Sequence, residues 1–353
     1  MILSNPKTGK QIIIPLKRAA EVFGQDFGNR KFICLPCDPA VAVHGREVLT
    51  LERSRPKKKL SGTCVVRMGG IGDLILMSSG LRALKQGMNG SRLTVATLKE
   101  HMALMAAMPF VDRCIAVDDL GKYKFDRMID LRFAVEPPEF GSACKGTWDS
   151  YTMEDRSDAF DKLLGVYPAP KRFDVPVDNK VTEKMAKSLP EKFVLLAAAI
   201  AAPARSIPIQ YIKRICSLVR RKLGMDVVLV GSSRKWNEEL KALEGKNIIN
   251  MIDKTNLQEM ISLCQLSDLV VTPDTGTLHV AGALRKKTIG VFGNINPRTR
   301  ISYYPTVKAI YPHGEKKCIP CWDLHPCNPK AECGPACMRV STPSRIMEVI
   351  SEG

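Results

Sequence analysis

Two segments of the sequence contain both glycines and residues whose side chains can take part in catalysis or binding. The first reads VVRMGGIGDLILMSSGLRAL. Gly69, Gly70 and Gly72 lie between an apolar run and a helical pattern, where a glycine backbone can approach a ligand closely. A dinucleotide-binding fingerprint would need a third glycine where Ile75 stands, and a phosphate-binding P-loop would need a lysine where Asp73 stands. The loop therefore supports neither of these cofactor sites.

The aspartate of this loop is predicted to lie at or near the N-terminus of a helix. There the exposed backbone N–H groups and the positive end of the helix dipole favour the ionised carboxylate. An ionised carboxylate in a glycine-lined site can accept a proton from a hydroxyl that attacks an electrophile, so Asp73 is a candidate general base. The alternative is that Asp73 only caps the helix, and this motif alone does not decide between the two.

The second segment, DLVVTPDTGTLHVAGAL, again indicates a strand, a tight turn and a helix. Thr275 and His279 are four residues apart and share one helical face near the helix N-terminus. The turn, with Asp274 and Gly276, can offer backbone N–H groups to a diphosphate, and Asp274 or His279 can add directional contacts. The alternative is an Asp or Thr helix cap with His279 as a histidine of the core.

The secondary structure that must position these segments can be predicted from the sequence pattern. From Cys64 onward, short strand-like runs alternate with helical patterns. The strand-like runs are residues 64–68, 92–97, 113–117, 127–131, 193–199, 226–231, 247–252, 268–272 and 288–293. Amphipathic segments such as LILMSSGLRALKQ and IQYIKRICSLVRRKL lie between several of them. This order predicts an α/β fold with parallel sheets covered by helices on both faces.

A proline-rich break, VYPAPKRFDVPVDNK, interrupts the alternation near its middle. It predicts two Rossmann-like domains whose ligands meet the carboxyl ends of both sheets in a cleft. The predicted units are a small β-rich appendage at 1–60, a first domain at 61–178, a second domain at 179–315, and a cysteine-rich segment with a C-terminal helix at 316–353.

Charge and length restrict the partners. The formal net charge of +17 on 353 residues predicts an anionic partner, such as a phosphorylated glycolipid, an anionic membrane surface or nucleic acid. The basic clusters at 53–59, 220–222 and 285–287 are scattered, which is more typical of solvated faces than of one binding groove. No apolar stretch is long enough to span a membrane and no secretory signal is present, so we expect a cytoplasmic protein.

Together the two segments resemble the ADP-heptose heptosyltransferases of glycosyltransferase family 9, which share a glycine–aspartate turn in the first domain and a D-T-G-x-x-H turn in the second. The resemblance runs from about Cys64 to the C-terminus. It implies a GT-B architecture, with the acceptor bound mainly by the first domain and the nucleotide sugar by the second. It also implies that Asp73 is the base of an inverting transfer, in which basic side chains and helix N-termini stabilise the leaving diphosphate without an obligatory bound metal.

The same resemblance assigns the remaining site residues and shows where this sequence departs from the family. It places donor binding at Arg205, Asp274, Thr275, Gly276 and His279, and close substrate approach at Gly69, Gly70 and Gly72. Arg205, in RSIP, takes the basic position of the usual K-x-W-P and can bind phosphate bidentately, whereas Ile207 replaces the tryptophan. The run AAAIAA and the positions around Lys235, Glu238 and Glu239 also depart from the pattern. The identities of the sugar and of the nucleobase in the donor therefore stay open.

Five cysteines crowd into the segment CIPCWDLHPCNPKAECGPACM, out of twelve in the chain. Four thiolates can form a closed tetrahedral zinc or iron site, and we predict Cys318, Cys321, Cys333 and Cys337 as its ligands, with Cys327 as the substitute for Cys333. The family branch that glycosylates autotransporter proteins is similar, with a cysteine-bound metal finger and an additional N-terminal domain. Such a metal would be structural. Free buried thiols or a disulfide are the alternatives, and a separate CLPC pair could meet the group in space.

Three functions remain open from the sequence. The first is transfer of a heptose-like sugar from an ADP-heptose-type donor to the lipopolysaccharide inner core, by an enzyme that contacts the membrane only peripherally. The second keeps this chemistry and changes the acceptor to a protein serine or threonine, or to a nucleic-acid base, because residues 1–60 form an appendage with a basic linker. The third is a non-catalytic nucleotide-sugar-binding module.

Overall fold

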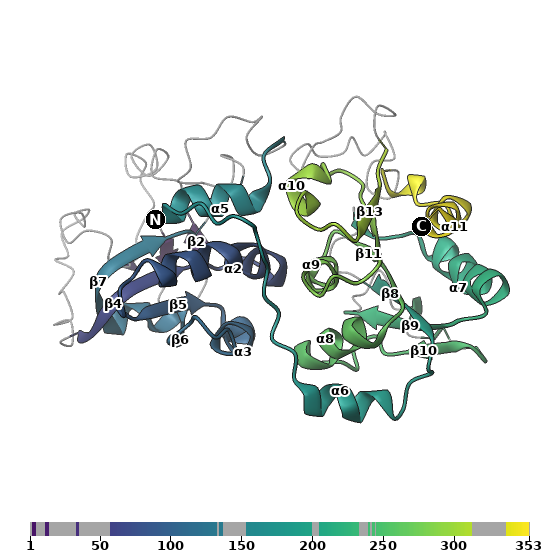
Figure 1. Ribbon diagram of the computed structural model, residues 1–353, viewed down its shortest axis with the longest axis horizontal. Coiled ribbons are helices and arrows are strands. Elements are labelled where there is room, and N and C mark those ends of the chain that lie inside the picture. Colours follow the sequence, from purple (N-terminus) through teal and green to yellow (C-terminus); the bar gives the residue numbers. More distant parts are fainter. Residues whose placement is uncertain are drawn as a thin grey trace, which may run out of the picture.

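The computed structural model describes residues 57–132, 134–136, 153–199, 205–232, 239–240, 242–243, 245–312 and 337–352, together with three short strands nearer the N-terminus. These strands are β1 (Ile2–Ser4), β2 (Gln11–Ile13) and β3 (Ile33–Cys34), and they pair antiparallel in the order β2-β1-β3. They fall in the region predicted to be a β-rich appendage. Most of the other described elements form two α/β units (Figure 1).

The first unit is built on a four-stranded parallel sheet of order β6-β5-β4-β7. Its strands are β4 (Lys58–Val66), β5 (Leu93–Thr97), β6 (Arg113–Ala116) and β7 (Tyr123–Asp130), and its helices are α2 (Ile71–Gln86), α3 (Met102–Ala106) and α5 (Arg156–Leu164). Helix α2 follows β4 after a short turn. Its N-terminus therefore lies at the carboxyl edge of the sheet, where α/β proteins bind ligands.

Helix α2 is buried on almost every side in its middle. All residues from Leu74 to Leu81 are buried. This follows from its position, because α5 packs on it as well as the sheet (Figure 1). Gly80 permits the close approach of α5, since a Cβ atom there would lie 2.4 Å from Oδ1 of Asp161. A helix enclosed in this way is a rigid support for the residues at its N-terminus.

The second unit has a six-stranded parallel sheet of order β10-β9-β8-β11-β12-β13, which is the doubly wound 3-2-1-4-5-6 order. The strands are β8 (Phe193–Ala199), β9 (Asp226–Gly231), β10 (Ile248–Asn250), β11 (Leu269–Pro273), β12 (Thr288–Val291) and β13 (Val307–Ile310). The helices are α6 (Asn179–Ala186), α7 (Ile209–Leu223), α8 (Leu257–Leu266), α9 (Gly276–Ala283), α10 (Arg298–Ile301) and α11 (Pro343–Ser351).

Two helices cover one face of this second sheet and form a core of their own. Ile212 and Val219 of α7 pack in the same apolar cluster as Ile346 and Met347 of α11. The last helix of the chain is therefore part of the core of the second unit. Helices α8 and α9 contribute instead to a different cluster.

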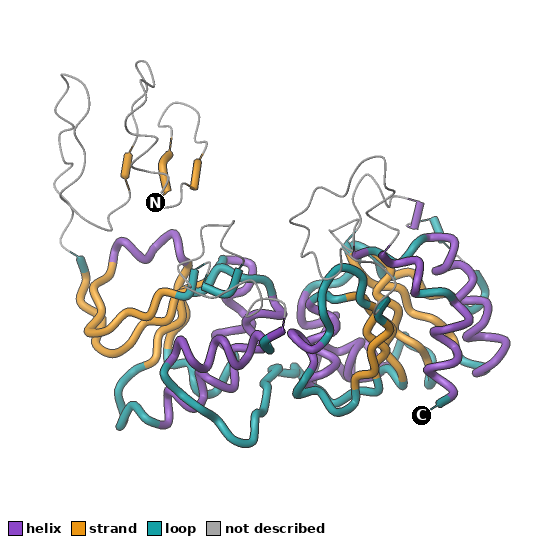
Figure 2. The backbone as a smooth tube through the Cα atoms, turned by 90° about the horizontal axis from the view of Figure 1, so that it is seen from above, coloured by secondary structure: helices purple, strands orange, loops and turns teal. Residues whose placement is uncertain are grey.

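That other cluster is continuous between the two units. It contains Leu74 and Met77 of α2 together with Val270 of β11, Val280 of α9 and Tyr304. Helices α2 and α9 are in direct contact, and the chain passes from one unit to the other along a loop (Figure 2). The two segments identified in the sequence thus face each other across a packed interface.

The predicted α/β fold with parallel sheets is confirmed, and each of the nine predicted strand-like runs contains a strand. Two differences have a physical reason. Strand β13 was not predicted because its two middle residues, Lys308 and Ala309, are exposed and VKAI is no continuous apolar run. Strand β7 begins at Tyr123, four residues before the predicted run, in an edge strand with mixed exposure. None of the helices in the described part of the chain is both long and apolar enough to cross a membrane.

Candidate active site

The aspartate of the first segment lies at the beginning of α2 without capping it. Asp73 is the third residue of the helix, and the N-cap residue is Gly70. The backbone N–H of Asp73 donates to the Gly70 carbonyl at 3.0 Å. The capping alternative is therefore wrong, whereas the predicted position near a helix N-terminus is confirmed.

Two arginines hold the Asp73 carboxylate. Nη2 of Arg67 lies 2.7 Å from Oδ2, and Nη1 of Arg156 lies 2.6 Å from Oδ1. Burial alone would raise the pKa of the Asp73 carboxyl, but the charges and hydrogen bonds of Arg156 and Arg67 outweigh it and hold this pKa well below its usual range. The carboxylate is ionised, as predicted, but the two arginines are the main cause.

Arg67 is a fixed partner in this group. Its side chain is 1% exposed, and it donates to the Leu131 carbonyl at 2.9 Å and to the two Glu136 carboxylate oxygens at 2.5 and 3.1 Å. The guanidinium also lies 5.3 Å from the ring centroid of Phe160 on α5. Because each of these contacts would be lost if the side chain moved, Arg67 gives Asp73 one orientation.

Arg156 reaches Asp73 from another element. It is the first residue of α5, and this helix begins there because the Asp155 carboxylate accepts hydrogen bonds from the backbone N–H of Ser157 at 2.9 Å and from its hydroxyl at 2.6 Å. The Arg156 side chain is 10% exposed. The Asp73 carboxylate is therefore held between the end of β4 and the beginning of α5.

The glycines of the first segment differ in what they allow. A Cβ atom at Gly69 would lie 2.2 Å from Oδ2 of Asp73 and 2.6 Å from Nε of Arg67, so this ion pair requires a glycine. A Cβ atom at Gly72 would lie 2.4 Å from Cδ2 of His279 in the other unit. A Cβ atom at Gly70 would meet nothing within 4 Å.

The second segment places a buried carboxylate at the end of β11. Nη1 of Arg205 donates to the Asp274 carbonyl at 2.9 Å and lies 3.6 Å from Oδ2, and Nε of Arg300 lies 3.6 Å from the same oxygen. Burial acts to raise the pKa of the Asp274 carboxyl, but the neighbouring His279 ring and the charges of Arg300 and Arg205 hold it well below its usual range. Two arginines share one carboxylate here.

His279 connects the features of this second segment. Its Nε2 lies 3.7 Å from Oδ1 of Asp274, its Nδ1 lies 3.3 Å from the Tyr304 hydroxyl, and the side chain is 5% exposed. Thr275 is the N-cap residue of α9, and its hydroxyl lies 3.1 Å from the Thr272 hydroxyl. His279 is thus held in the interior, yet it lies directly at the interface with the first unit.

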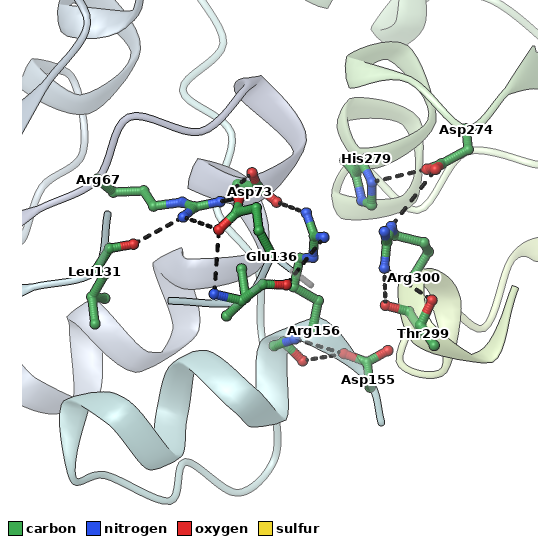
Figure 3. Close-up of polar contacts among 12 residues, drawn as sticks. Arg67, Asp73, Leu131, Glu136, Asp155, Arg156, Asp274, His279, Thr299 and Arg300 are labelled. Carbon is green, nitrogen blue, oxygen red and sulfur yellow. Dashed lines mark hydrogen bonds and ion pairs between the residues drawn. The ribbon is translucent and has the colours of Figure 1, made fainter. Parts of the chain in front are cut away.

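The two segments meet at the N-termini of their helices, as Figure 3 shows for Asp73, Arg156, Asp274, His279 and Arg300. Gly72 packs against His279, and a Cβ atom at Gly276 would lie 3.3 Å from Cβ of Ile71. Burial and the nearby charge of Arg156 lower the pKa of Arg300 to about 10, which also indicates that groups of the two units face each other. The arrangement combines an ionised carboxylate on one side with arginines and a helix N-terminus on the other.

Gly72→Ala is expected to lower the catalytic rate about a hundredfold. Alanine normally favours a helix by about 1 kcal/mol over glycine, so the loss would come from the methyl group that displaces His279 and moves the two segments apart. Gly87→Ala, at the other end of α2, is the matched control, because its φ is −78° and its methyl group would make only ordinary contacts of 3.6 and 3.8 Å with backbone oxygens. Steady-state kinetics of both variants test this expectation, and equal rates for the two would contradict it.

Several residues of the site were not found from the sequence: Arg67, Glu136, Arg156, Arg300 and Tyr304. Arg67 had a usable signal, because it is a lone charge directly after the apolar run CVV of β4. The other four had none, since they lie far from the two segments in sequence and only the fold brings them to the site.

Some predicted residues lie outside the described residues. These are Cys318, Cys321, Cys327, Cys333, Lys235 and Glu238, as well as the side chains of Cys34 and Cys37. Cys337 is described and is buried. Glu239 is described and exposed. Within the described ranges, no three His, Cys, Asp or Glu side chains lie close enough together to hold a metal ion.

Two facing doubly wound units with functional groups at their carboxyl edges define the GT-B class of proteins. The chain belongs to glycosyltransferase family 9 (heptosyltransferase), because the model of this family matches residues 142–326, just over half of the chain. This match includes Arg156, Arg205, Asp274, His279 and Arg300, and it begins after Asp73.

Individual proteins show the same relation. Lipooligosaccharide heptosyltransferase 2 of Haemophilus influenzae is 27% identical over 127 residues, which cover 34% of this chain and 36% of that protein. The aligned region thus covers little more than a third of the length of this curated relative. The solved structure of ADP-heptose LPS heptosyltransferase II of E. coli is similar with a TM-score of 0.63 and 17% identity, covering 82% of this chain and 98% of that one. TibC, an iron-containing dodecameric heptosyltransferase from enterotoxigenic E. coli H10407, is also similar in structure. Its TM-score is 0.61 at 18% identity, and the match covers 84% of this chain and 76% of TibC.

Proposed function

We propose that this protein is an inverting glycosyltransferase that moves a heptose-like sugar from an ADP-heptose-type donor to a hydroxyl of the lipopolysaccharide inner core. The observation that carries the proposal is the position of the Asp73 carboxylate. It is ionised, and it lies in the first turn of a helix that packs directly against the His279 segment of the second unit. A base and a diphosphate site on opposite sides of one interface are what this reaction needs.

The second unit supplies the groups for the donor. The N-terminus of α9 presents backbone N–H groups and the positive end of a helix dipole, which favour a diphosphate. Arg205 and Arg300 lie at the same place, each 3.6 Å from Oδ2 of Asp274. Their charge would stabilise the negative charge that develops on the leaving diphosphate, without a catalytic metal in the proposed step. Thr275, Gly276 and His279 complete the proposed donor site.

The first unit supplies the groups for the acceptor. Gly69, Gly70 and Gly72 keep the approach to Asp73 free of side chains. In the proposed step, the acceptor hydroxyl loses its proton to Asp73 while its oxygen forms a bond to the anomeric carbon of the sugar. The bond from this carbon to the diphosphate oxygen breaks on the opposite face, and its electron pair leaves with the nucleoside diphosphate. The configuration of the sugar is therefore inverted.

The names of similar proteins support the choice of substrates. The Haemophilus relative is a lipooligosaccharide heptosyltransferase, and TibC has been solved in complex with ADP-D-β-D-heptose. The net charge of +17 agrees with an anionic glycolipid as acceptor and with peripheral contact with a membrane. Product formation on a protein instead of the glycolipid would favour the alternative acceptor.

We also propose a structural metal, zinc or iron, at Cys318, Cys321, Cys333 and Cys337. The support is the chemistry of four thiolates and the likeness in fold to TibC, which is described as iron-containing. The proposed transfer step needs nothing from such a metal. Metal analysis of the purified protein and of a Cys337→Ser variant tests this site, and wild-type protein without bound metal would contradict it.

The donor assignment predicts a selective thermal shift. A ligand that binds only the folded state stabilises it by about 2.7 kcal/mol at a hundred times its Kd. ADP-heptose is expected to raise the midpoint of unfolding by several degrees. GDP- and UDP-sugars at the same concentration should give much smaller shifts. A panel of these nucleotide sugars measures the effect, and a larger shift with a GDP- or UDP-sugar would replace the proposed donor.

A further inference from the structure

The contacts of Asp73 raise a problem for its proposed role as base. Both carboxylate oxygens already contact an arginine, Oδ2 at 2.7 Å and Oδ1 at 2.6 Å. A carboxylate held in this way is a poor proton acceptor, because the hydrogen bonds and positive charges stabilise its ionised form. One of the two arginines has to leave before Asp73 can take a proton from an acceptor hydroxyl.

The two arginines differ in how firmly they are held. Arg67 is 1% exposed and has further hydrogen bonds to Glu136 and Leu131. Arg156 also has partners besides Asp73, among them the Val135 carbonyl at 3.5 Å, but its side chain is 10% exposed and so lies nearer to the surface than that of Arg67. Arg156 is therefore the arginine that can be exchanged, and Oδ1 is the oxygen that its departure would free.

Arg156 also faces the groups that would bind the donor. In Figure 3 its guanidinium lies on the side of Asp73 that faces Arg300, and its charge is one cause of the lowered pKa of Arg300. Helix α5 is tied to the second unit near Arg300, because the Tyr303 hydroxyl donates to the Asp158 carboxylate at 2.9 and 3.0 Å. A diphosphate beside Arg300 would thus lie near Arg156 and would attract it.

We propose that Arg156 is a shared cation, which binds Asp73 in the absence of donor and moves to the donor diphosphate when the nucleotide sugar binds. Its departure frees Oδ1 of Asp73, which then accepts the proton of the acceptor hydroxyl as the sugar–oxygen bond forms and the sugar–phosphate bond breaks. The base becomes competent only when donor is present, so donor binds before productive attack. This inference rests on the proposed function and adds to it a coupling between the donor and the base.

ADP affinity tests the coupling without any need for turnover. Isothermal titration with ADP compares the wild type, Arg156→Gln, Asp73→Asn and the double variant. Arg156→Gln is expected to weaken ADP binding about tenfold, because one charge-assisted contact to the diphosphate is lost. Asp73→Asn is expected to tighten ADP binding several-fold when Arg156 is present, since the arginine no longer has to leave a carboxylate. In the Arg156→Gln background this tightening should be much smaller.

The outcomes separate the shared cation from simpler explanations. Equal tightening by Asp73→Asn in both backgrounds would show only through-space repulsion of the diphosphate and would overturn the inference. Wild-type ADP affinity in Arg156→Gln would also overturn it and would leave the proposed function intact. If the wild type bound no ADP but another nucleoside diphosphate, that ligand would serve as the probe. If it bound no nucleoside diphosphate, the proposed function itself would fail.

Two further variants guard against a purely structural effect. Arg156→Lys keeps the charge and is expected to recover most of the ADP affinity. Arg220→Gln removes an arginine of an ion pair on α7, where its side chain is 50% exposed, and is expected to bind ADP like the wild type.

A pH profile adds an independent readout. Loss of Arg156 raises the pKa of Asp73, so the acid limb of kcat/KM should appear at higher pH in Arg156→Gln than in the wild type.

Discussion

Asp73→Asn is expected to lower the rate of sugar transfer about a thousandfold while the protein remains folded and its affinity for ADP does not fall. The asparagine has nearly the same size and can still accept a hydrogen bond from an arginine, but it cannot take the proton of the acceptor hydroxyl. A positioned general base contributes typically 10² to 10⁴ in rate, which sets the expected size of about 10³. Steady-state transfer and ADP titration of the same preparation measure both effects.

The pH dependence gives this prediction a second check. The pKa of the Asp73 carboxyl is held well below its usual range, so the group is ionised throughout the neutral range. The wild type should therefore lose no activity through protonation of Asp73 between about pH 5 and pH 9. Asp130→Asn is the matched control, since that carboxylate pairs with Arg132 and is 35% exposed. Transfer by Asp73→Asn at the rate of this control would rule out the proposed base.

Arg67→Met is expected to cost about 3–5 kcal/mol of the free energy of unfolding, which corresponds to a fall of roughly 10 °C in Tm. Methionine fills much of the volume next to Phe160, so the loss comes mainly from charge. Without the arginine, Glu136 loses its bidentate partner, and Asp73 keeps only Arg156. A partly buried carboxylate that loses its ion-pair partner is strongly destabilising. Urea and thermal unfolding measure the change.

Arg132→Met provides the comparison for this loss. Arg132 pairs with Asp130, and the two side chains are 25% and 35% exposed, so solvent screens the pair. Exposed ion pairs contribute about 0–1 kcal/mol, and we expect a loss in that range. If Arg67→Met were no less stable than Arg132→Met, Arg67 could not be the buried support of Asp73.

The sequence was sufficient for the order of strands and helices, because the apolar runs of parallel sheets are buried on both faces and stand out from amphipathic helices. A strand with exposed positions in its middle carries less signal, which is why β13, where Lys308 and Ala309 are exposed, was missed. The contact between α2 and α9 could not be predicted from periodicity. It depends on two glycines, Gly72 and Gly276, whose missing side chains allow the helix ends to touch, and this becomes visible only when both helices are placed.

The candidate site divides in a similar way. Asp73 and Asp274 were found because each follows a strand and opens a helical pattern beside glycines. Their partners could not be found, since Arg156 is 83 residues from Asp73. For the same reason the cause of the ionised state was wrongly attributed to the helix terminus. Ion pairs between distant segments dominate the pKa of a buried carboxylate, and local sequence carries no information about them.

The most direct measurement is a transfer assay with the wild-type chain, ADP-heptose and a heptose-deficient lipopolysaccharide inner core, with mass spectrometry of the product and NMR of the new linkage. We expect release of one ADP for each heptose added, and a linkage of configuration opposite to that of the donor. Retained configuration would contradict the role of Asp73 as base opposite a donor held at the His279 segment, and no transfer by folded protein that binds ADP-heptose would contradict the inner core as acceptor.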